Sequence, residues 1–411
     1  MAVAEHEAIP TPSLGDVPPS PGVVVMKFGG TSVGDAERLK HVARRLVAAR
    51  ESGSKVVAVV SAMGRQTDDL LSLAHDVSPS PQPRELDMLL SVGERISCAL
   101  VAMAIVDLGH RAISLTGSQA GIVTDSSHTK AKIVEVRAQR IHEALDRDEI
   151  VLVAGFQGVS SESLDVTTLG RGGSDTTAVA LAAALGADAC EIYTDVRGVF
   201  TADPRLVPEA RKLDRLSFEE MLEMASSGAG VMMARSIEIA RTHTVRLNVR
   251  SSFEEGDGTW ITEEDDPMLE KALISAVVHQ RQETVYRTRG TSPARLFAAL
   301  AEANVNVDTI LQERENEVVF SAPPEDRGAA VRALDGLGAS WEARDDLGKV
   351  SVIGAGMKSH PGVAARTFAT LEEAGVTPAV VSTSPIKIAC HVDASQVELA
   401  VRALHEAFDL G

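Results

Sequence analysis

The chain has 411 residues, of which 44% are hydrophobic, and a formal net charge of −18. This length supports two or three domains with buried cores. The acidic balance has no long basic stripe to offset it, which argues against nucleic acid or an anionic membrane as partners and favours small molecules.

The cysteines and the hydropathy pattern indicate a cytoplasmic protein. Cys98, Cys190 and Cys390 lie far apart without metal-ligand spacing, as expected for core residues in a reducing compartment. The chain has no uninterrupted apolar run of about 18 residues and no signal-like start, so no membrane span is expected.

The first two thirds of the chain alternate between strand-like and helix-like segments. Residues 1–21 are rich in proline and poor in apolar residues, which predicts a disordered extension. Short β-branched runs follow at 23–28, 55–62, 111–116, 149–156 and 189–194, separated by helix-like segments such as 35–50. This order predicts an α/β domain over 22–255, a three-layer fold with a mostly parallel central sheet, whose ligands bind beyond the carboxyl ends of the strands.

The last third of the chain contains an internal repeat. The acidic, turn-rich stretch 254–267 predicts a linker over 256–270. Two α+β units follow, at 271–345 and 346–411, and each reads strand, helix, strand, strand, helix.

Matching segments support this repeat. "VRAL" occurs twice, and "EANVNVDTILQ" aligns with "EAGVTPAVVST". Pro293 and Pro361 each open the first helix, and the stretch after Pro293 is three residues shorter, so the first unit is shortened and divergent.

Several predicted strands run directly into glycine or small polar residues. "VMKFGGTS" places Lys27 at the end of a buried strand, before Gly29 and Gly30. Lysine is a point charge for phosphate oxygens, and glycines let backbone N–H groups approach them. We favour this interpretation over a surface lysine before a turn, because a charge after four apolar residues is poorly placed for solvation.

Three further motifs are ambiguous by themselves. In "SVGERIS", Glu94 could receive an amino group near a helix start, although the residues alone favour an ordinary surface ion pair. "LGRGGSDTTAVALAAAL" is a phosphate cradle or a tight turn before an apolar helix. "YTDVRGVFTADPR" could hold a nucleotide base, Mg²⁺ and phosphate, or form a turn capped by Asp-Pro. Walker and "GxGxxG" motifs are missing.

These motifs, together with "SAMG", "TGSQAG" and "AGFQG", occur in an order that resembles the aspartate kinases, members of the amino-acid kinase fold. The resemblance covers about residues 23–411, because the repeated units are similar to paired ACT domains, which are ferredoxin-like. It implies ATP-dependent phosphorylation, with Mg²⁺, of the β-carboxylate of L-aspartate to 4-phospho-L-aspartate, the first step of the aspartate-derived pathway to lysine and threonine. It also implies a homo-oligomer, at least a dimer through the ACT-like units.

The resemblance also assigns roles to individual residues. Lys27 would contact the transferring phosphoryl group, and Asp175 would organise this lysine. Glu94 would bind the substrate ammonium, and Arg171 and Ser174 would hold its carboxylate. Thr31, Ser32 and Gly173 would complete the substrate site, while the nucleotide site would comprise Lys27, Gly29, Gly30, Thr194, Asp195, Phe200, Asp203 and Arg205. No residue is assigned as a metal ligand.

The catalytic half departs from the family pattern at two positions. Gly230 stands where the family usually carries a lysine toward the ATP phosphates, and Arg235 is the neighbouring cation that could compensate. Phe200 replaces the more frequent tyrosine, which removes a hydroxyl and keeps the stacking face.

The regulatory half departs further. "GTSPAR" replaces the Asp-Lys-Pro-Gly turn, and Pro385 stands where glutamate is common, so we expect weak or absent feedback by lysine and threonine. Three questions stay open at this point. The chain could phosphorylate a modified aspartate, through a change around Glu94 and Arg171, or be a catalytically weak regulatory homologue; an internal start at Met268 could also give a separate regulatory chain.

Overall fold

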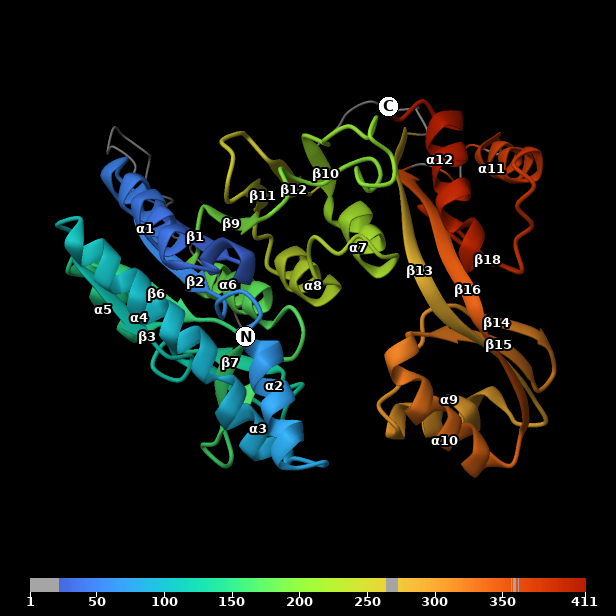
Figure 1. Ribbon diagram of the computed structural model, residues 1–411, viewed down its shortest axis with the longest axis horizontal. Coiled ribbons are helices and arrows are strands. Elements are labelled where there is room, and N and C mark those ends of the chain that lie inside the picture. Colours follow the sequence, from blue (N-terminus) through green and yellow to red (C-terminus); the bar gives the residue numbers. More distant parts are fainter. Residues whose placement is uncertain (1–21, 264–272, 356, 358–359, 361) are drawn as a thin grey trace, which may run out of the picture.

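The computed structural model describes residues 22–263, 273–355, 357, 360 and 362–411 (Figure 1). The predicted extension at 1–21, together with Met268 and Pro361, lies outside the described residues.

The catalytic half is built on an eight-stranded sheet. Its spatial order is β10 (Arg215–Ser217), β12 (Thr259–Thr262), β11 (Leu247–Ser251), β9 (Ala189–Thr194), β1 (Val23–Phe28), β2 (Lys55–Val60), β6 (Ile150–Ala154) and β3 (Ala112–Leu115). All neighbouring strands are parallel except β11 and β12. The mostly parallel sheet expected from the alternating pattern is therefore confirmed.

Helices cover both faces of this sheet. The helices α1 (Ala36–Glu51) and α4 (Val92–Asp107) pack on one face, and α5 (Gln139–Asp146), α6 (Gly173–Leu185), α7 (Phe218–Ser226) and α8 (Ala234–Thr242) pack on the other (Figure 1). Helix α6 is buried almost throughout, between the sheet and α8. A helix with no solvent face needs no polar stripe, which explains its apolar sequence.

The strand β12 corrects the predicted linker at 256–270. It pairs antiparallel with β11, and Thr259 and Ile261 are fully buried. The sequence did not predict this strand, because it follows acidic and glycine-rich residues and its four residues are too few to show a clear alternation of apolar and polar side chains. The remainder of that predicted linker, 264–270, lies outside the described residues.

A smaller sheet lies beyond the main one. Its order is β5 (Ile133–Val136), β4 (Ile122–Thr124), β7 (Gln157–Ser160) and β8 (Val166–Thr168), with α2 (Gln66–Val77) and α3 (Pro83–Leu90) beside it. The stretch Pro83–Asp107, which spans α3 and α4, is long and apolar enough by length and composition to cross a membrane. This is weak evidence, because a core helix passes the same test, and α4 packs its inner face on the main sheet.

The two ACT-like units share one six-stranded sheet, ordered β14 (Ile310–Arg314), β15 (Glu317–Ala322), β13 (Leu273–Arg289), β16 (Ser340–Ala355), β18 (Lys387–Asp393) and β17 (Val380–Ser384). The long strands β13 and β16 run antiparallel, so the start of β13 pairs with the end of β16. This corrects the predicted boundaries: the first strand of the region at 271–345 also completes the sheet of the second unit. A sequence repeat cannot show such an exchange, because strand pairing is non-local.

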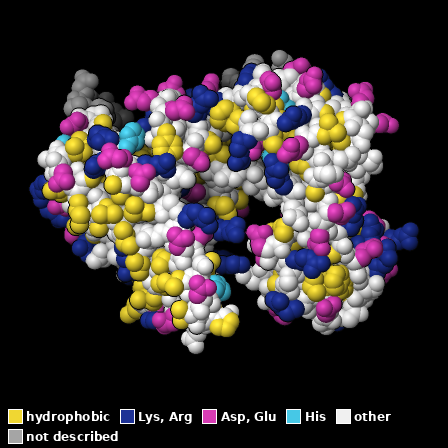
Figure 2. Space-filling view, in the orientation of Figure 1, with side chains coloured by type: hydrophobic (Ala, Val, Ile, Leu, Met, Phe, Trp, Pro, Cys, Tyr) yellow, Lys and Arg dark blue, Asp and Glu magenta, His cyan; other side chains and the backbone are white. Residues whose placement is uncertain are grey.

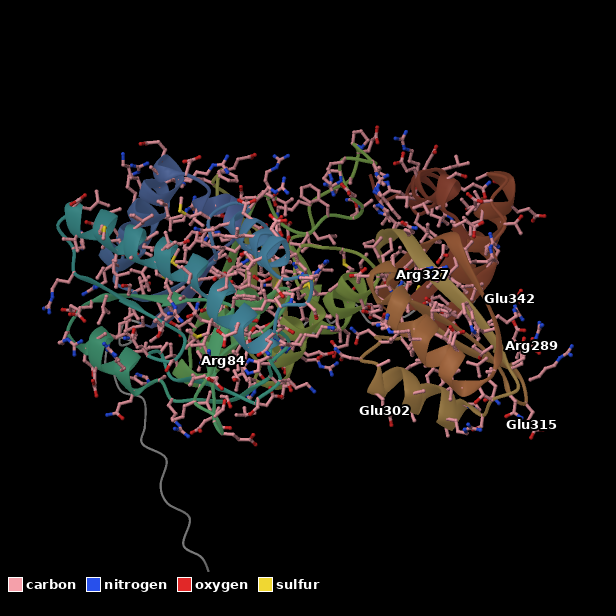
Figure 3. The ribbon with its side chains drawn as sticks, turned by 60° about the horizontal axis from the view of Figure 1, so that its bottom comes forward. Arg84, Arg289, Glu302, Glu315, Arg327 and Glu342 are labelled. Atoms are coloured by element: carbon pink, nitrogen blue, oxygen red, sulfur yellow. The ribbon has the colours of Figure 1, made fainter. Side chains whose placement is uncertain are left out.

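Four helices cover the shared sheet. The first unit has α9 (Pro293–Glu302) and α10 (Arg327–Leu337), and the second has α11 (Gly362–Glu373) and α12 (Val397–Ala407). Helix α9 has ten residues and α11 has twelve, so the first copy is the shorter one, as expected. Charged pairs such as Arg289 with Glu342 lie on the solvent side of the first unit (Figure 3).

The two units differ in how they meet the catalytic half. The second unit shares a hydrophobic cluster with Leu206 and Val207 of the catalytic half, and Lys387 Nζ lies 2.8 Å from Glu223 of α7. In the described part of the chain, the one ion pair from the first unit to the catalytic half joins Glu325 to Arg171 at 3.8 Å. Figure 2 shows a hollow between the first unit and the catalytic half, below the place where the second unit packs on the catalytic half. The second unit is therefore anchored, and the first is attached mainly through the shared strands.

Candidate active site at the ends of the parallel strands

Lys27 is buried beside a carboxylate on the first turn of α6. The two-residue period of β1 places Val25 and Lys27 on the face toward α6, whereas Met26 and Phe28 face α1. Lys27 Nζ lies 2.6 Å from Asp175 Oδ1, and only about a tenth of each side chain is exposed. The predicted pair is thus preassembled in a site of low dielectric, where a charge acts strongly on a bound phosphoryl group.

The loop before α6 is held in a tight conformation. Gly170 and Gly172 have φ angles of 76° and 66°, which favour glycine. Gly173 N–H donates to Gly170 O at 3.0 Å, and a Cβ on Gly173 would lie 2.8 Å from the Phe156 ring. The backbone of this loop therefore approaches its neighbours closely and presents the helix N-terminus, with the buried Ser174, to the site.

Arg235 supports this loop from outside. Its guanidinium donates to Leu169 O at 3.1 Å and to Ala131 O at 2.9 Å. The expectation that Arg235 could replace a phosphate-binding lysine at Gly230 is therefore not supported, because two bonds to backbone carbonyls hold its guanidinium at this loop.

Glu94 lies in the first turn of α4 with one carboxylate oxygen free. Its Oε1 accepts a hydrogen bond from Ala62 N–H at 3.2 Å, while Oε2 is buried without a partner. Burial raises the pKa of Glu94 to about 7, although the hydrogen bond from Ala62 and the charge of Arg95 oppose this. The surface ion pair favoured by the residues alone is wrong, and the free oxygen can accept a bond from a ligand cation.

The turn after β1 is fixed against neighbouring strands. Gly29 N–H donates to Tyr193 O at 3.2 Å, and a Cβ on Gly30 would lie 3.0 Å from Ala62 O. Ser32 Oγ, which is buried, lies 2.5 Å from Ser252 Oγ, whereas Thr31 is exposed. The turn therefore packs against Ala62, whose N–H is bonded to Glu94, and a side chain at Gly30 would press on backbone oxygens.

Arg171, predicted to bind the substrate carboxylate, does not point into the site in this structure. Its side chain is 85% exposed, and its ion-pair partner is Glu325 of the first ACT-like unit. Four residues further on, Asp175 is buried against Lys27. Arg171 lies on the loop side of the helix start, where nothing in the described structure fixes its guanidinium over the site.

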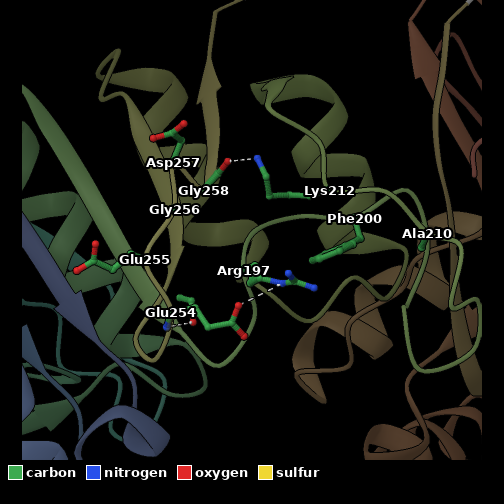
Figure 4. A pocket seen from close by; sticks show the side chains of 10 residues that line it. Arg197, Phe200, Ala210, Lys212, Glu254, Glu255, Gly256, Asp257 and Gly258 are labelled. Atoms are coloured by element: carbon green, nitrogen blue, oxygen red, sulfur yellow. Dashed lines mark hydrogen bonds and ion pairs between the residues drawn. The ribbon is translucent and has the colours of Figure 1, made fainter.

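A cavity of about 490 Å³ is lined by several residues predicted to bind the nucleotide, which is the phosphoryl donor. We call it the donor cavity. Its lining includes Thr194, Asp195, Phe200, Asp203, Arg205 and Gly230. Arg205 Nη2 lies 2.8 Å from Asp203 Oδ2, and these hydrogen bonds lower the pKa of Asp203. Phe200 also lines a second cavity of about 360 Å³, where Lys212 donates to Gly258 O at 2.6 Å (Figure 4). Phe200 therefore borders both cavities, where its ring offers a stacking surface.

Sequence reasoning missed Asp87, a fully buried carboxylate on α3. It accepts hydrogen bonds from Thr168 Oγ1 at 2.5 Å and Thr129 N–H at 3.1 Å, and it lies 2.6 Å from His128 Nδ1. These bonds tie the segment around His128 to the end of β8, directly before the loop that enters α6. The signal available in the sequence was a single acidic residue inside the apolar stretch "LDMLL".

Phe156, in "AGFQG", is a second missed residue. Its φ of 68° is unusual for a non-glycine residue, and its N–H lies 3.2 Å from Thr177 Oγ1 on α6. Such strain persists where surrounding structure holds it, often at functional sites.

Comparison with known proteins identifies the family. Residues 22–251 match the amino acid kinase family, and residues 350–408 match an ACT domain. The aspartokinase of Mycolicibacterium smegmatis is 53% identical over 95% of this chain and 96% of its own length, and that of Corynebacterium glutamicum is 50% identical over the same shares.

A solved structure supports the fold. Escherichia coli aspartokinase III, in complex with aspartate and ADP, has a TM-score of 0.82 at 24% identity, covering 94% of this chain and 99% of that one. At this identity the likeness concerns the fold, whereas the close relatives establish the family. The chain therefore belongs to the aspartokinases, kinases of the amino acid kinase family that carry C-terminal ACT domains.

Proposed function

We propose that the protein transfers the γ-phosphoryl group of MgATP to the β-carboxylate of L-aspartate, giving 4-phospho-L-aspartate and ADP. Two observations carry this proposal together: the buried pair of Lys27 and Asp175, and the buried, unpartnered carboxylate oxygen of Glu94. One group suits a transferring phosphoryl and the other an amino-acid ammonium, and both lie at the carboxyl ends of the parallel strands.

The chemistry requires positioning and positive charge. A β-carboxylate is already a nucleophile, so one of its oxygens forms the new P–O bond while the bond from the γ-phosphorus to the β,γ-bridging oxygen breaks and ADP leaves. No strong general base is needed. The main barrier is repulsion between two anions, which Lys27 offsets in its buried surroundings. Asp195 and Asp203 line the donor cavity, and their carboxylates suit the Mg²⁺ that accompanies ATP.

Substrate recognition divides among three groups. Glu94 Oε2 accepts the ammonium, and the N-terminus of α6 with Ser174 Oγ binds the α-carboxylate. Arg171 turns from Glu325 toward the bound carboxylate, which its exposed position allows. These contacts recognise the ammonium and the α-carboxylate of the substrate, and the β-carboxylate is left free to meet the phosphoryl group at Lys27.

Purified protein tests the reaction directly. We expect aspartate-dependent ADP release and trapping of the acyl phosphate by hydroxylamine, well above the background without aspartate. Absence of turnover with aspartate would favour the catalytically weak homologue that Gly230 suggests, and turnover only with a modified aspartate would favour the specialised kinase.

Regulation follows from the ACT-like units. We propose that they associate between chains as at least a dimer, with weak or absent inhibition by lysine and threonine. Pro385 lies in the turn between β17 and β18, where it offers neither a carboxylate nor a backbone N–H to an amino-acid effector. Millimolar lysine plus threonine should leave most activity intact, and strong synergistic inhibition would contradict this proposal.

A further inference from the structure

The donor cavity is poor in positive charge. Its described lining has two basic side chains, Arg205 and His279, and two acidic ones, Asp195 and Asp203. Arg205 is already paired with Asp203 and is largely exposed. A polyphosphate that binds here therefore needs a further hydrogen-bond donor from a side chain in the cavity wall.

The wall beside Gly230 has an opening. A Cβ on Gly230 would meet no atom within 4 Å. Two residues earlier, Gly228 has a φ of 114°, and a Cβ there would lie 2.1 Å from His279 O. This close approach brings strand β13 of the ACT-like region against the segment after α7 and places His279 at the edge of the cavity.

We propose that His279 is a nucleotide-binding residue, whose imidazole donates a hydrogen bond to the polyphosphate across the wall that Gly230 leaves open. This inference rests on the proposed function, because it requires the nucleotide in this cavity. A side chain from the regulatory half then completes the donor site.

The charged groups around His279 set the pKa of its imidazole, so the proposed contact should make nucleotide binding depend on pH. Burial lowers the pKa of the free imidazole, with Arg281 on the same strand and Arg205 acting in the same direction. Asp203 in the catalytic loop and Glu398 on α12 act in the opposite direction. A bound polyphosphate raises this pKa, so nucleotide binding takes up a proton and strengthens as the pH falls through the interval between the two pKa values.

His279 also links the nucleotide to the second ACT-like unit. It lines a neighbouring cavity of about 660 Å³ together with Arg281, Glu398 and Arg402. Glu398 and Arg402 lie on α12. A shift of β13 against α12 would therefore move a nucleotide contact directly.

Calorimetry of the full-length protein with MgADP tests the inference. We expect His279→Ala to weaken MgADP binding by about 10- to 100-fold, the equivalent of one hydrogen bond to a charged group. Binding of adenosine, which has no phosphate, should change less than twofold. His243→Ala, an exposed histidine after α8, serves as the matched control and should leave both affinities unchanged.

Proton counting gives a second readout. Calorimetry in two buffers of different ionisation enthalpy should show fewer protons taken up by His279→Ala than by the wild type. Gly230→Lys should restore MgADP affinity in the His279→Ala background and add less to the wild type, because both side chains would bind the same phosphates.

The outcomes separate the inference from the proposed function. Unchanged MgADP affinity and proton uptake in His279→Ala, in an enzyme that still phosphorylates aspartate, would overturn the inference alone. Equal losses for adenosine and MgADP would overturn the phosphate contact. A wild type that neither binds MgADP nor turns over aspartate would overturn the proposed function itself.

Discussion

The half of the site proposed for aspartate, the phosphoryl acceptor, and the half proposed for the nucleotide, the phosphoryl donor, are built in different ways. On the acceptor side, Lys27, Asp175 and Glu94 are buried and held by strands and helix starts before any ligand arrives. On the donor side, Arg205 is 88% exposed and Gly230 contributes no side chain. The groups proposed for the chemistry are preorganised, whereas nucleotide affinity depends on peripheral contacts, so substitutions in the two halves should differ in size and in the kinetic constant they change.

The largest loss is expected at Lys27. Lys27→Ala removes the buried cation and leaves Asp175 without its partner, so kcat should fall about 10³-fold or more. Lys40→Ala is the control, because Lys40 is exposed and paired only with Glu37 on the surface of α1. Aspartate-dependent ADP release measures both, and a loss below tenfold would refute the proposed role of Lys27.

Glu94→Gln should separate activity from stability. The neutral amide cannot pair with the substrate ammonium, so kcat/KM for aspartate should fall by about 10²-fold. The pKa of Glu94 is raised from 4.5 to about 7, so the folded state binds this proton more tightly and wild-type stability falls as the pH rises through that interval. The variant avoids this loss and should be more stable by about 1–3 kcal/mol above pH 7.

Urea unfolding at pH 5 and pH 8 measures this difference, which should be largest at pH 8. Glu85→Gln, an exposed glutamate on α3, is the matched control. The same pKa predicts that wild-type kcat/KM for aspartate decreases below about pH 7, and a flat profile down to pH 5.5 would contradict the role of Glu94.

Arg171 tests whether the first ACT-like unit restrains the acceptor half. Arg171→Ala should lower kcat/KM for aspartate by about 10- to 100-fold, as for one charge-assisted contact. Glu325→Ala releases Arg171 from an exposed pair and should change the same constant by less than about threefold, because such pairs contribute little. Similar kinetics for Arg171→Ala and the wild type would remove Arg171 from the site.

The smallest effect is expected on the donor side. Phe200→Tyr adds a hydroxyl to a ring that lines both cavities, so the KM for ATP should change by less than about twofold. Initial rates at varied ATP measure it, and a change above tenfold would show that this position does more than stack.

The sequence predicted the strands better than it predicted which strands pair with each other. The five β-branched runs become β1, β2, β3, β6 and β9, because a buried parallel strand must be apolar throughout. The pair of Lys27 and Asp175, expected from the resemblance, is present. The strand β12 and the exchange of β13 between the ACT-like units were missed, because short and non-local pairings leave no local pattern.

The site residues show the same division. Glycine, lysine and carboxylate at strand ends indicated where ligands would bind. The free oxygen of Glu94, the engagement of Arg235 with backbone carbonyls and the exposure of Arg171 depend on distances between segments far apart in the chain. No spacing along the sequence encodes those distances.

The sequence by itself determined the fold class and the internal repeat, because composition and periodicity are local properties of the chain, and the resemblance added the missing lysine at Gly230. Only the tertiary structure decided which charges are buried, which are already paired, and that His279 of β13 lines the cavity proposed for the nucleotide. The reason is physical: desolvation and hydrogen bonding shift pKa values and select partners according to three-dimensional neighbours.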